Sequence, residues 1–385
     1  MITRVELEER EESTLSPYAQ KSKNSRGRKH PEGESDFRTA YQRDRDRILH
    51  STAFRRLEYK TQVFVNHEGD HYRTRLTHTL EVAQVATSIA RAMGLNEDLT
   101  EAIALAHDIG HTPFGHAGEE VLHGIMEEYG GFEHNSQGLR VVDLLEDKYP
   151  NFPGLNLTFE TREGIIKHKT SYDNPDTSLL KDFEPDASPT LEAQIVNVAD
   201  EIAYNSHDLD DGLAAGYITL EELMEVQLFR EIYEEQKRKI QGKSKKILIS
   251  STVRELIGAQ IRDVIKAAEE NIKKHNIRTV EDVRQAPPLI SFSEEMAEKN
   301  QKLKDFLFSK LYRHYKVVKM QEKAKRFLKA LFEVYLQDPQ QLPPDHYKRT
   351  ETEPVERVIC DYIAGMTDRY AQDEYTRLFV PYAKM

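Results

Sequence analysis

Four short segments of this chain place histidine and carboxylate side chains at spacings that suit a metal centre. The segments are Arg75–His78, Ala106–His116, Phe132–Asn135 and Val198–Glu201. Within 57 residues there are six histidines, at positions 78, 107, 111, 116, 123 and 134. Two neutral imidazoles and two carboxylates would make a mixed nitrogen and oxygen ligand set, which suits Mn²⁺, Mg²⁺, Fe²⁺, Co²⁺ or Ni²⁺ better than a structural zinc. Water and a phosphate oxygen could fill the remaining coordination positions.

One predicted helix carries a carboxylate inside the core. From Thr190 onward the chain is apolar round most of a helical circumference, so this helix must be buried. Its polar exceptions fall on one stripe: Asn197, Asp200, Glu201, Tyr204 and Asp208. Buried polar groups need partners, so the stripe is predicted to face a cavity that holds a metal or a ligand.

Three further helices are predicted to position the histidines. Apolar residues recur at helical spacing over 78–94, 96–108 and 112–131, and a glycine, an asparagine cap or a Thr-Pro pair marks their ends. All three would meet around the turn at Gly110. The histidines of these segments would therefore be forced together by the packing of the apolar stripes.

The rest of the chain is predicted to be helical with one exception. Helices are expected over 35–57 and 132–148, and the pair 61–65 and 71–75 is read as a β-hairpin, the only strand pair. Residues 150–160 and 169–189 are read as loops. Later helices are expected over 220–236, 252–275, 294–315, 317–336 and 354–378. The fold class is thus all-α, with a flexible polar tail over 1–34, a core over 35–215 and a helical C-terminal region over 216–385.

Composition narrows the class of protein. The net charge is -12 with 31% charged and 38% hydrophobic residues, which fits an acidic globular protein and disfavours a globally basic nucleic-acid binder. No apolar run is long enough for a membrane span and the start has no signal-peptide pattern, so a cytoplasmic protein with no membrane partner is expected. The single cysteine, Cys360, excludes an internal disulfide and is read as a buried thiol.

The ordered motifs resemble a known family. The order of His, His-Asp and a distant Asp is similar to the HD superfamily of metal-dependent phosphohydrolases. Five blocks more closely resemble its dGTP triphosphohydrolase family: Arg55–Leu57, Lys60–Val63, Arg75–His78, His107–His116 and Phe132–Asn135. The match runs from about Ser35 to Gly212, with a weaker similarity over 361–370. The resemblance implies an HD-domain helical core and relatives that form homo-oligomers.

The resemblance also implies roles for individual residues. The metal ligands would be His78, His107, Asp108 and Asp200. His116 with Glu119 would be a catalytic pair, which agrees with their i, i+3 spacing on one helix face. Further proton donors or phosphate contacts would be His111 and His134. Asn135 stands where the vertebrate relative has a glutamate, which argues against a proton relay at this position.

Substrate contacts follow from the same resemblance. Gln62 would contact the sugar 3′-hydroxyl, Arg75 the nucleotide, and Tyr204 and Asp208 the sugar or phosphate. Arg55 would either contact the polyphosphate or lie on a solvated helix face. The implied reaction converts a deoxynucleoside triphosphate (dNTP), either dGTP or several dNTPs, and water to a deoxynucleoside and inorganic triphosphate.

Two alternatives stay open at the level of the sequence. The same metal chemistry could act on a nucleotide monophosphate or a signalling nucleotide. A protein of another class, a regulator that binds nucleotides or single-stranded DNA through the basic segments 21–29 and 237–246, would need no hydrolytic chemistry. An activating dNTP or single-stranded DNA is also left open as a further partner.

Overall fold

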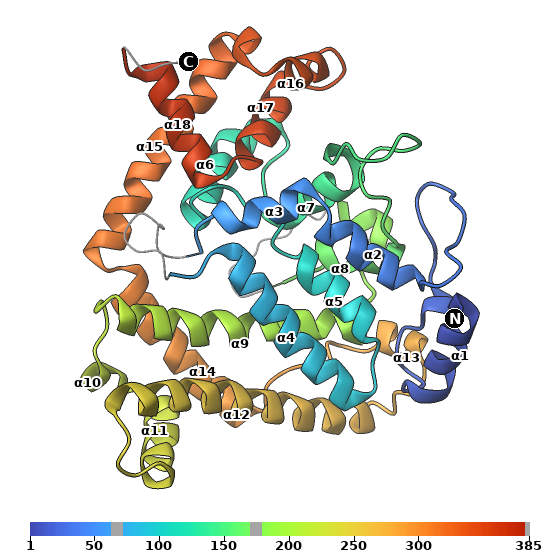
Figure 1. Cartoon of the computed structure of the whole chain (residues 1–385), viewed down its shortest axis with the longest axis vertical. Coiled ribbons are helices and arrows are strands. Elements are labelled where there is room, and N and C mark those ends of the chain that lie inside the picture. Colours follow the sequence, from blue (N-terminus) through green and yellow to red (C-terminus); the bar gives the residue numbers. More distant parts are fainter. Residues whose placement is uncertain (63–71, 170–178, 382–385) are drawn as a thin grey trace.

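The chain is built from helices. The computed structural model describes residues 1–62, 72–169 and 179–381, and within these ranges it contains helices and no strand. Figure 1 shows them arranged around α9, which crosses the middle of the molecule. No helix among the described residues is long and apolar enough to cross a membrane.

The central layer holds the elements on which the predicted metal ligands stand. It consists of α2 (Ala40–Leu49), α4 (Arg75–Met93), α5 (Glu97–Ala106), α9 (Leu191–Ala214) and α12 (Lys245–Lys274). In it, α4 packs against both α5 and α9 (Figure 1). Side-chain caps at Thr74, Asn96 and Thr190 begin α4, α5 and α9, and Gly94 ends α4 in the left-handed conformation. Polar and apolar periodicity thus predicts these elements correctly.

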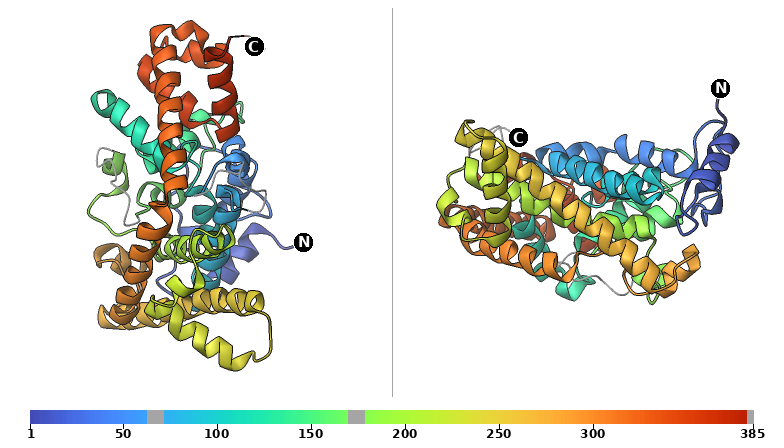
Figure 2. Two further views of the ribbon diagram at one scale, coloured as in Figure 1. Left: turned by 90° about the vertical axis from the view of Figure 1, so that its left-hand side faces the viewer. Right: turned by 90° about the horizontal axis from the view of Figure 1, so that it is seen from below.

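Two further apolar clusters flank this layer. One joins α6 (His116–Met126), α15 (Tyr315–Gln337), α17 (Val355–Ala364) and α18 (Asp368–Phe379). The other lies between the end of α9 and α11 (Gln227–Lys239), α12 and α14 (Glu294–Leu307). Figure 2 shows α15 running parallel to the long axis over part of the molecule, and its residues contribute to both clusters, Val317 to the second and Leu328 to the first. The remaining α-helices are α1 (Arg4–Thr14), α3 (Thr52–Arg56), α7 (His134–Arg140), α8 (Phe159–Ile166), α10 (Leu220–Leu223), α13 (Val280–Gln285) and α16 (Pro344–Arg349).

The predicted β-hairpin is not supported. Most of it, residues 63–71, lies outside the described residues, and its two flanks make only an isolated antiparallel bridge between Thr61 and Thr74. Within the described ranges the fold is therefore all-α. A single bridge is too short to count as a strand pair.

Several predicted helices are shorter than expected because local caps interrupt them. The segment 35–57 forms two helices, since Thr39 caps α2 and Ser51 caps α3. The predicted helix over 132–148 is α7 followed by a π-helical turn over 141–145. The predicted helix over 354–378 breaks at 365–367, where Thr367 caps α18.

The N-terminal segment differs from the predicted flexible tail. Residues 4–14 form α1, and four of the five basic side chains over 21–29 pair with acids of the same chain. The pairs are Lys21 with Glu12, Arg26 with Glu184, Arg28 with Asp44, and Lys29 with Asp143. These charges are therefore engaged within the fold rather than waiting for a phosphate partner.

Glu192 ties this segment to the core. Its Oε1 accepts hydrogen bonds from the backbone N–H groups of Gln20 at 3.0 Å and Asn96 at 3.1 Å. The carboxyl is fully buried on α9, and burial raises the pKa of Glu192 from its ordinary 4.5 to about 7. Ionisation at neutral pH therefore costs folding free energy at this position.

Replacing Glu192 with glutamine is expected to change how stability depends on pH. The folded state holds the proton more tightly than the unfolded state, so the contribution of Glu192 is largest below pH 4.5 and is lost as pH rises through about 7. The loss is at most about 3 kcal/mol. Glutamine keeps the Oε1 acceptor and cannot ionise. The free energy of unfolding of the variant should therefore rise relative to that of the wild type between pH 5 and pH 8. Denaturant unfolding of both proteins at these two pH values measures the difference, and a constant difference would contradict the prediction.

Candidate metal centre and active-site cavity

The structure brings the four predicted metal ligands together. His78 lies on α4, His107 and Asp108 follow α5, and Asp200 lies in the middle of α9. His78 Nε2 is 3.0 Å from Asp200 Oδ1, and His107 Nε2 is 3.9 Å from the same atom. Asp108 Oδ1 is 3.5 Å from His107 Nε2, and Asp108 Oδ2 is 3.9 Å from His78 Nε2. All four side chains are buried.

Their free atoms fit a divalent cation. Within the described part of the chain, His107 Nε2 and Asp108 Oδ2 are buried and have no hydrogen-bond partner. The other ring nitrogens are already held, because His107 Nδ1 is 2.6 Å from the Ala104 carbonyl oxygen and His78 Nδ1 is 2.8 Å from His207 Nε2. Each Nε2 is thereby left for the centre of the group, as in histidine ligands whose second nitrogen is fixed by a neighbour. His78, His107 and Asp200 together could hold a metal ion.

The electrostatics of this group also suit a cation. Burial alone would raise the pKa of both aspartates, but Arg75 and His107 beside Asp108, and hydrogen bonds from His168 and His78 to Asp200, hold them well below their usual range. Burial lowers the pKa of His107. Ionised carboxylates and a neutral imidazole are the forms that bind metals.

His78 behaves differently from His107. Burial opposes its charged form, but the hydrogen bond to Asp200 and the charges of Asp108 and Asp200 outweigh burial and raise the pKa of His78. Without a metal ion, the His78 imidazole therefore binds a proton more readily than an ordinary histidine. Metal binding by the group should release that proton.

A second group of polar side chains lies beside the first. The N-terminal half of α6 supplies Glu119, whose Oε1 is 2.9 Å from His134 Nδ1 and accepts the backbone N–H of His134 at 3.0 Å. His111 stacks on His134 with ring centroids 4.0 Å apart, and its Nδ1 is 3.7 Å from Glu119 Oε2. Burial opposes ionisation of Glu119, but the charge of His134 and its hydrogen bond outweigh burial and lower the pKa of Glu119. Glu119 is thus an ionised carboxylate between two imidazoles.

The position of His116 differs from the predicted one. We expected it inside a helix begun by Thr112, but α6 begins at His116 itself, after Phe114 and Gly115 adopt positive φ angles of 62° and 60°. His116 is exposed and lines the cavity, with its ring 6.2 Å from that of His111. The contact atoms of Glu119 given above belong to His134 and His111, so the pairing of Glu119 with His116 stays a prediction.

Both groups open into one cavity of about 530 Å³. Four of the predicted substrate contacts line it: Gln62, Arg75, Tyr204 and Asp208. Arg75 also donates to Asp108 Oδ1 at 2.9 Å. Arg55 is exposed on α3 and is not among the lining residues, which favours the solvated-face interpretation for this arginine.

Sequence reasoning missed several residues of this site. His168, after α8, lies 3.4 Å from Asp200 Oδ2, and His207 contacts both His78 and Asp208. His207 is seven residues after Asp200 and so belongs on the same helix face, a signal that helical spacing could have provided. His168 follows a loop boundary and left no such signal. Glu201, predicted to face the cavity, instead contacts Asn300 and Lys304 on α14.

The far wall of the cavity comes from the C-terminal region. Phe308, Tyr312 and Arg313 line it together with the first turns of α15. The Tyr312 hydroxyl donates to Asp208 Oδ2, so this wall is tied to α9. Residues after 290 thus complete the cavity, although their sequence pattern indicated only helical packing.

Known proteins match this chain along almost its whole length. The HD domain model matches residues 75–205, and the phosphohydrolase-associated domain model matches residues 290–377. A deoxyguanosinetriphosphate triphosphohydrolase-like protein of Geobacter sulfurreducens is 57% identical over 97% of both chains. Proteins with the same description from Geobacter metallireducens and Ralstonia pickettii are 54% identical over 100% of both chains and 55% identical over 96% and 95%, respectively. The chain therefore belongs to the deoxyguanosinetriphosphate triphosphohydrolase-like family of HD-domain hydrolases.

Proposed function

We propose that this protein hydrolyses deoxynucleoside triphosphates to a deoxynucleoside and inorganic triphosphate. The observation that carries the proposal is the shared cavity: its lining includes two imidazoles and two carboxylates of the kind that bind metals, and also Gln62, Arg75, Tyr204 and Asp208. The names of the relatives refer to deoxyguanosine triphosphate, which supports the substrate class. The ligands proposed for the cation are His78, His107, Asp108 and Asp200.

The donor set supports Mn²⁺ or Mg²⁺, with Fe²⁺, Co²⁺ and Ni²⁺ as further candidates. When bound, such a cation withdraws charge from a phosphate oxygen and lowers the pKa of coordinated water. Hydrolysis then requires water to attack the α-phosphorus while the bond from that phosphorus to the 5′-oxygen breaks. The departing 5′-oxygen needs a proton, which an imidazole in the cavity can donate.

The residues of the second group have separate tasks in this scheme. Glu119 accepts the Nδ1–H of His134, which favours the charged imidazole and directs its Nε2 proton away from the carboxylate. His116, at the cavity wall, is the other candidate donor of that proton. Arg75 lines the cavity next to Asp108, and its guanidinium can bind a phosphate oxygen while keeping its buried carboxylate partner.

A product assay tests the proposal. The purified protein is incubated with dATP, dCTP, dGTP and dTTP, singly and mixed, with Mn²⁺ or Mg²⁺, and the products are separated by anion exchange. We expect deoxynucleoside and inorganic triphosphate in equal amounts, and neither after the metal is removed with EDTA. The mixture is included because one nucleotide could activate hydrolysis of another. Monophosphate and pyrophosphate as products, or no reaction with any nucleotide and metal, would contradict the proposal.

A further inference from the structure

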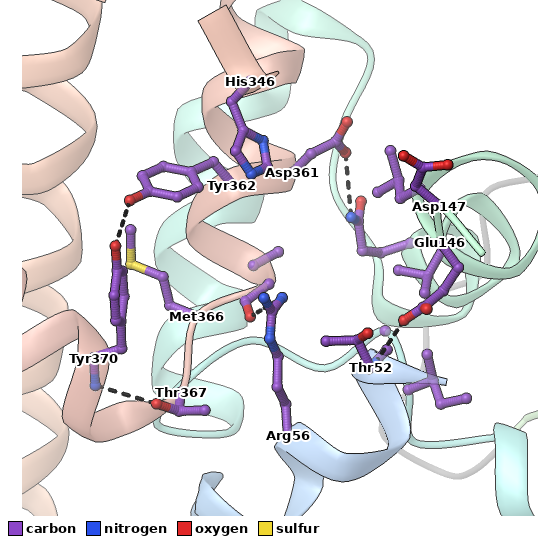
Figure 3. Close-up of a pocket in the computed structure, with 18 of the residues that line it drawn as sticks. Thr52, Arg56, Glu146, Asp147, His346, Asp361, Tyr362, Met366, Thr367 and Tyr370 are labelled. Carbon is purple, nitrogen blue, oxygen red and sulfur yellow. Dashed lines mark hydrogen bonds between the residues drawn. The ribbon is translucent and has the colours of Figure 1, made fainter. Parts of the chain in front are cut away.

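The connection between α17 and α18 reaches back to the active site. It spans residues 365–367 and is flanked by Ala364 and Asp368, all within the 361–370 segment that has the weaker family similarity. On one side, this connection and the start of α18 contact Thr61 and Phe114, two residues that line the active-site cavity. The other side borders a second cavity of about 550 Å³ (Figure 3).

Asp368 makes the main contacts on the active-site side. Its Oδ2 accepts the backbone N–H of Thr61 at 3.0 Å and also the Thr61 hydroxyl. Its Oδ1 accepts the backbone N–H of Phe114 at 2.9 Å. The carboxylate is buried, so all three donors would lose a partner without water to replace it. One side chain thereby joins two backbone segments that are more than fifty residues apart.

Neighbouring contacts hold the same two segments. The buried Lys60 ammonium donates to the carbonyl oxygens of His111 at 2.5 Å and Ala364 at 2.9 Å. On the side of the second cavity, Arg56 donates to the Gly365 carbonyl oxygen at 3.0 Å, and Thr367 caps α18 by accepting the N–H of Tyr370 (Figure 3). These contacts keep the connection itself in place.

The two segments that Asp368 joins carry cavity residues. Phe114 and Gly115 form the turn with positive φ angles that sets the start of α6, and therefore the position of His116. A Cβ on Gly115 would lie 3.3 Å from the Arg75 guanidinium and 3.4 Å from the Gln62 carbonyl oxygen, so the turn is seated directly against both. A shift of this turn would move His116 relative to Gln62. None of the four proposed metal ligands touches Asp368.

We propose that Asp368 is a positioning residue of the active site: its carboxylate holds the Phe114 turn against Thr61 and so places His116 for catalysis. The proposal rests on the proposed function, because it assigns His116 to the reaction. It differs from a role in overall folding, since it predicts loss of turnover with metal binding retained. An error of about 1 Å in such placement can cost about a hundredfold in rate.

The test compares Asp368→Asn with Asp373→Asn, which changes an exposed aspartate of the same helix. In Asp368→Asn an amide N–H₂ group replaces one of the two oxygens that accept hydrogen bonds from Thr61 and Phe114, so donor faces donor at that position. We expect kcat to fall at least about tenfold, with KM and Mn²⁺ affinity changed less than about threefold. Asp373→Asn should match the wild type. Unchanged kcat in Asp368→Asn, or an equal loss of Mn²⁺ affinity, would overturn the proposal.

A second pair of variants covers the case in which Asp368→Asn does not fold. Thr61→Val removes the hydroxyl donor to Asp368, and Thr61→Ser keeps it. We expect Thr61→Val to lower kcat and Thr61→Ser to restore most of it. Equal kcat in the two variants would overturn the proposal.

Amide hydrogen exchange separates this inference from the proposed function. Peptides covering residues 58–62 and 112–116 should exchange faster in Asp368→Asn than in the wild type, while peptides from α4, α5 and α9 should be unchanged. If the wild type has no dNTP hydrolase activity but the exchange result is obtained, the proposed function fails and the positioning contact stands. Unchanged exchange in both peptides would overturn the positioning role whatever the activity.

Discussion

Replacing His107 with alanine is expected to abolish most of the metal binding and the hydrolytic activity. The imidazole contributes a buried Nε2 that has no hydrogen-bond partner among the described residues, so its removal takes away a ligand while breaking one hydrogen bond, that between Nδ1 and the Ala104 carbonyl oxygen. Mutating a residue that hydrogen-bonds to a metal ligand typically costs about 10–100-fold in metal affinity or activity. Loss of the ligand itself should therefore cost on the order of 10³-fold. Mn²⁺ titration calorimetry and the triphosphate assay measure the two effects.

His123→Ala is the matched control for this prediction. His123 is an exposed imidazole of α6 that lies outside the cavity lining, with its Nδ1 2.9 Å from the Phe132 carbonyl oxygen. Its loss should leave Mn²⁺ affinity and turnover within about twofold of the wild type, as expected for a surface change away from the site. If His107→Ala still binds Mn²⁺ with wild-type affinity, the four-residue group is not the metal centre.

Replacing Glu119 with glutamine is expected to lower kcat on the order of a hundredfold, with little change in metal affinity. His134 lowers the pKa of Glu119 despite burial, and the ionised Glu119 supplies the negative charge that favours the imidazolium form of His134. Glutamine keeps the size of the side chain but removes that charge. General acid and base groups contribute about 10²–10⁴-fold to rate, and losing the group that orients the acid removes part of this. Steady-state kinetics with Mn²⁺ at saturation isolates the effect on kcat.

The pH profile adds a second measure of the same change. Since the carboxylate favours the protonated imidazole, its loss should shift the descending limb of the kcat profile to lower pH. Glu127→Gln, at an exposed position just after α6, is the control and should keep the wild-type profile. The role given to Glu119 is wrong if its glutamine variant loses activity with an unshifted profile and lost Mn²⁺ binding.

The same assays show whether His116 or His134 donates the proton. His116 and His134 both line the cavity, but Glu119 contacts His134 through its ring and its backbone N–H. If His134 is the proton donor, adding Glu119→Gln to His134→Ala should cost little further activity, since the two act as a unit. If His116 is the donor instead, adding Glu119→Gln to His116→Ala should cost little further activity.

Helical periodicity and capping residues predicted much of the fold around the site. The apolar stripes of α4 and α5 and the polar stripe of α9 are properties of spacing along one helix, so Asp200 could be assigned to the face it shares with Tyr204 and Asp208. The same spacing places His207 on this face of α9, although His207 was not among the predicted site residues. Element ends were less well predicted, because Ser51 and Thr367 act as caps inside segments whose apolar pattern runs on without a break.

Residue types and their order along the chain predicted the kind of chemistry: imidazoles and carboxylates at these spacings indicate a mixed nitrogen and oxygen ligand set. Only the tertiary structure decided which groups meet. Glu119 contacts His134 from another helix, His168 reaches Asp200 from after α8, and Asp368 holds Thr61 across more than three hundred residues. Such contacts depend on how helices pack in three dimensions, and periodicity within one helix carries no information about its partners.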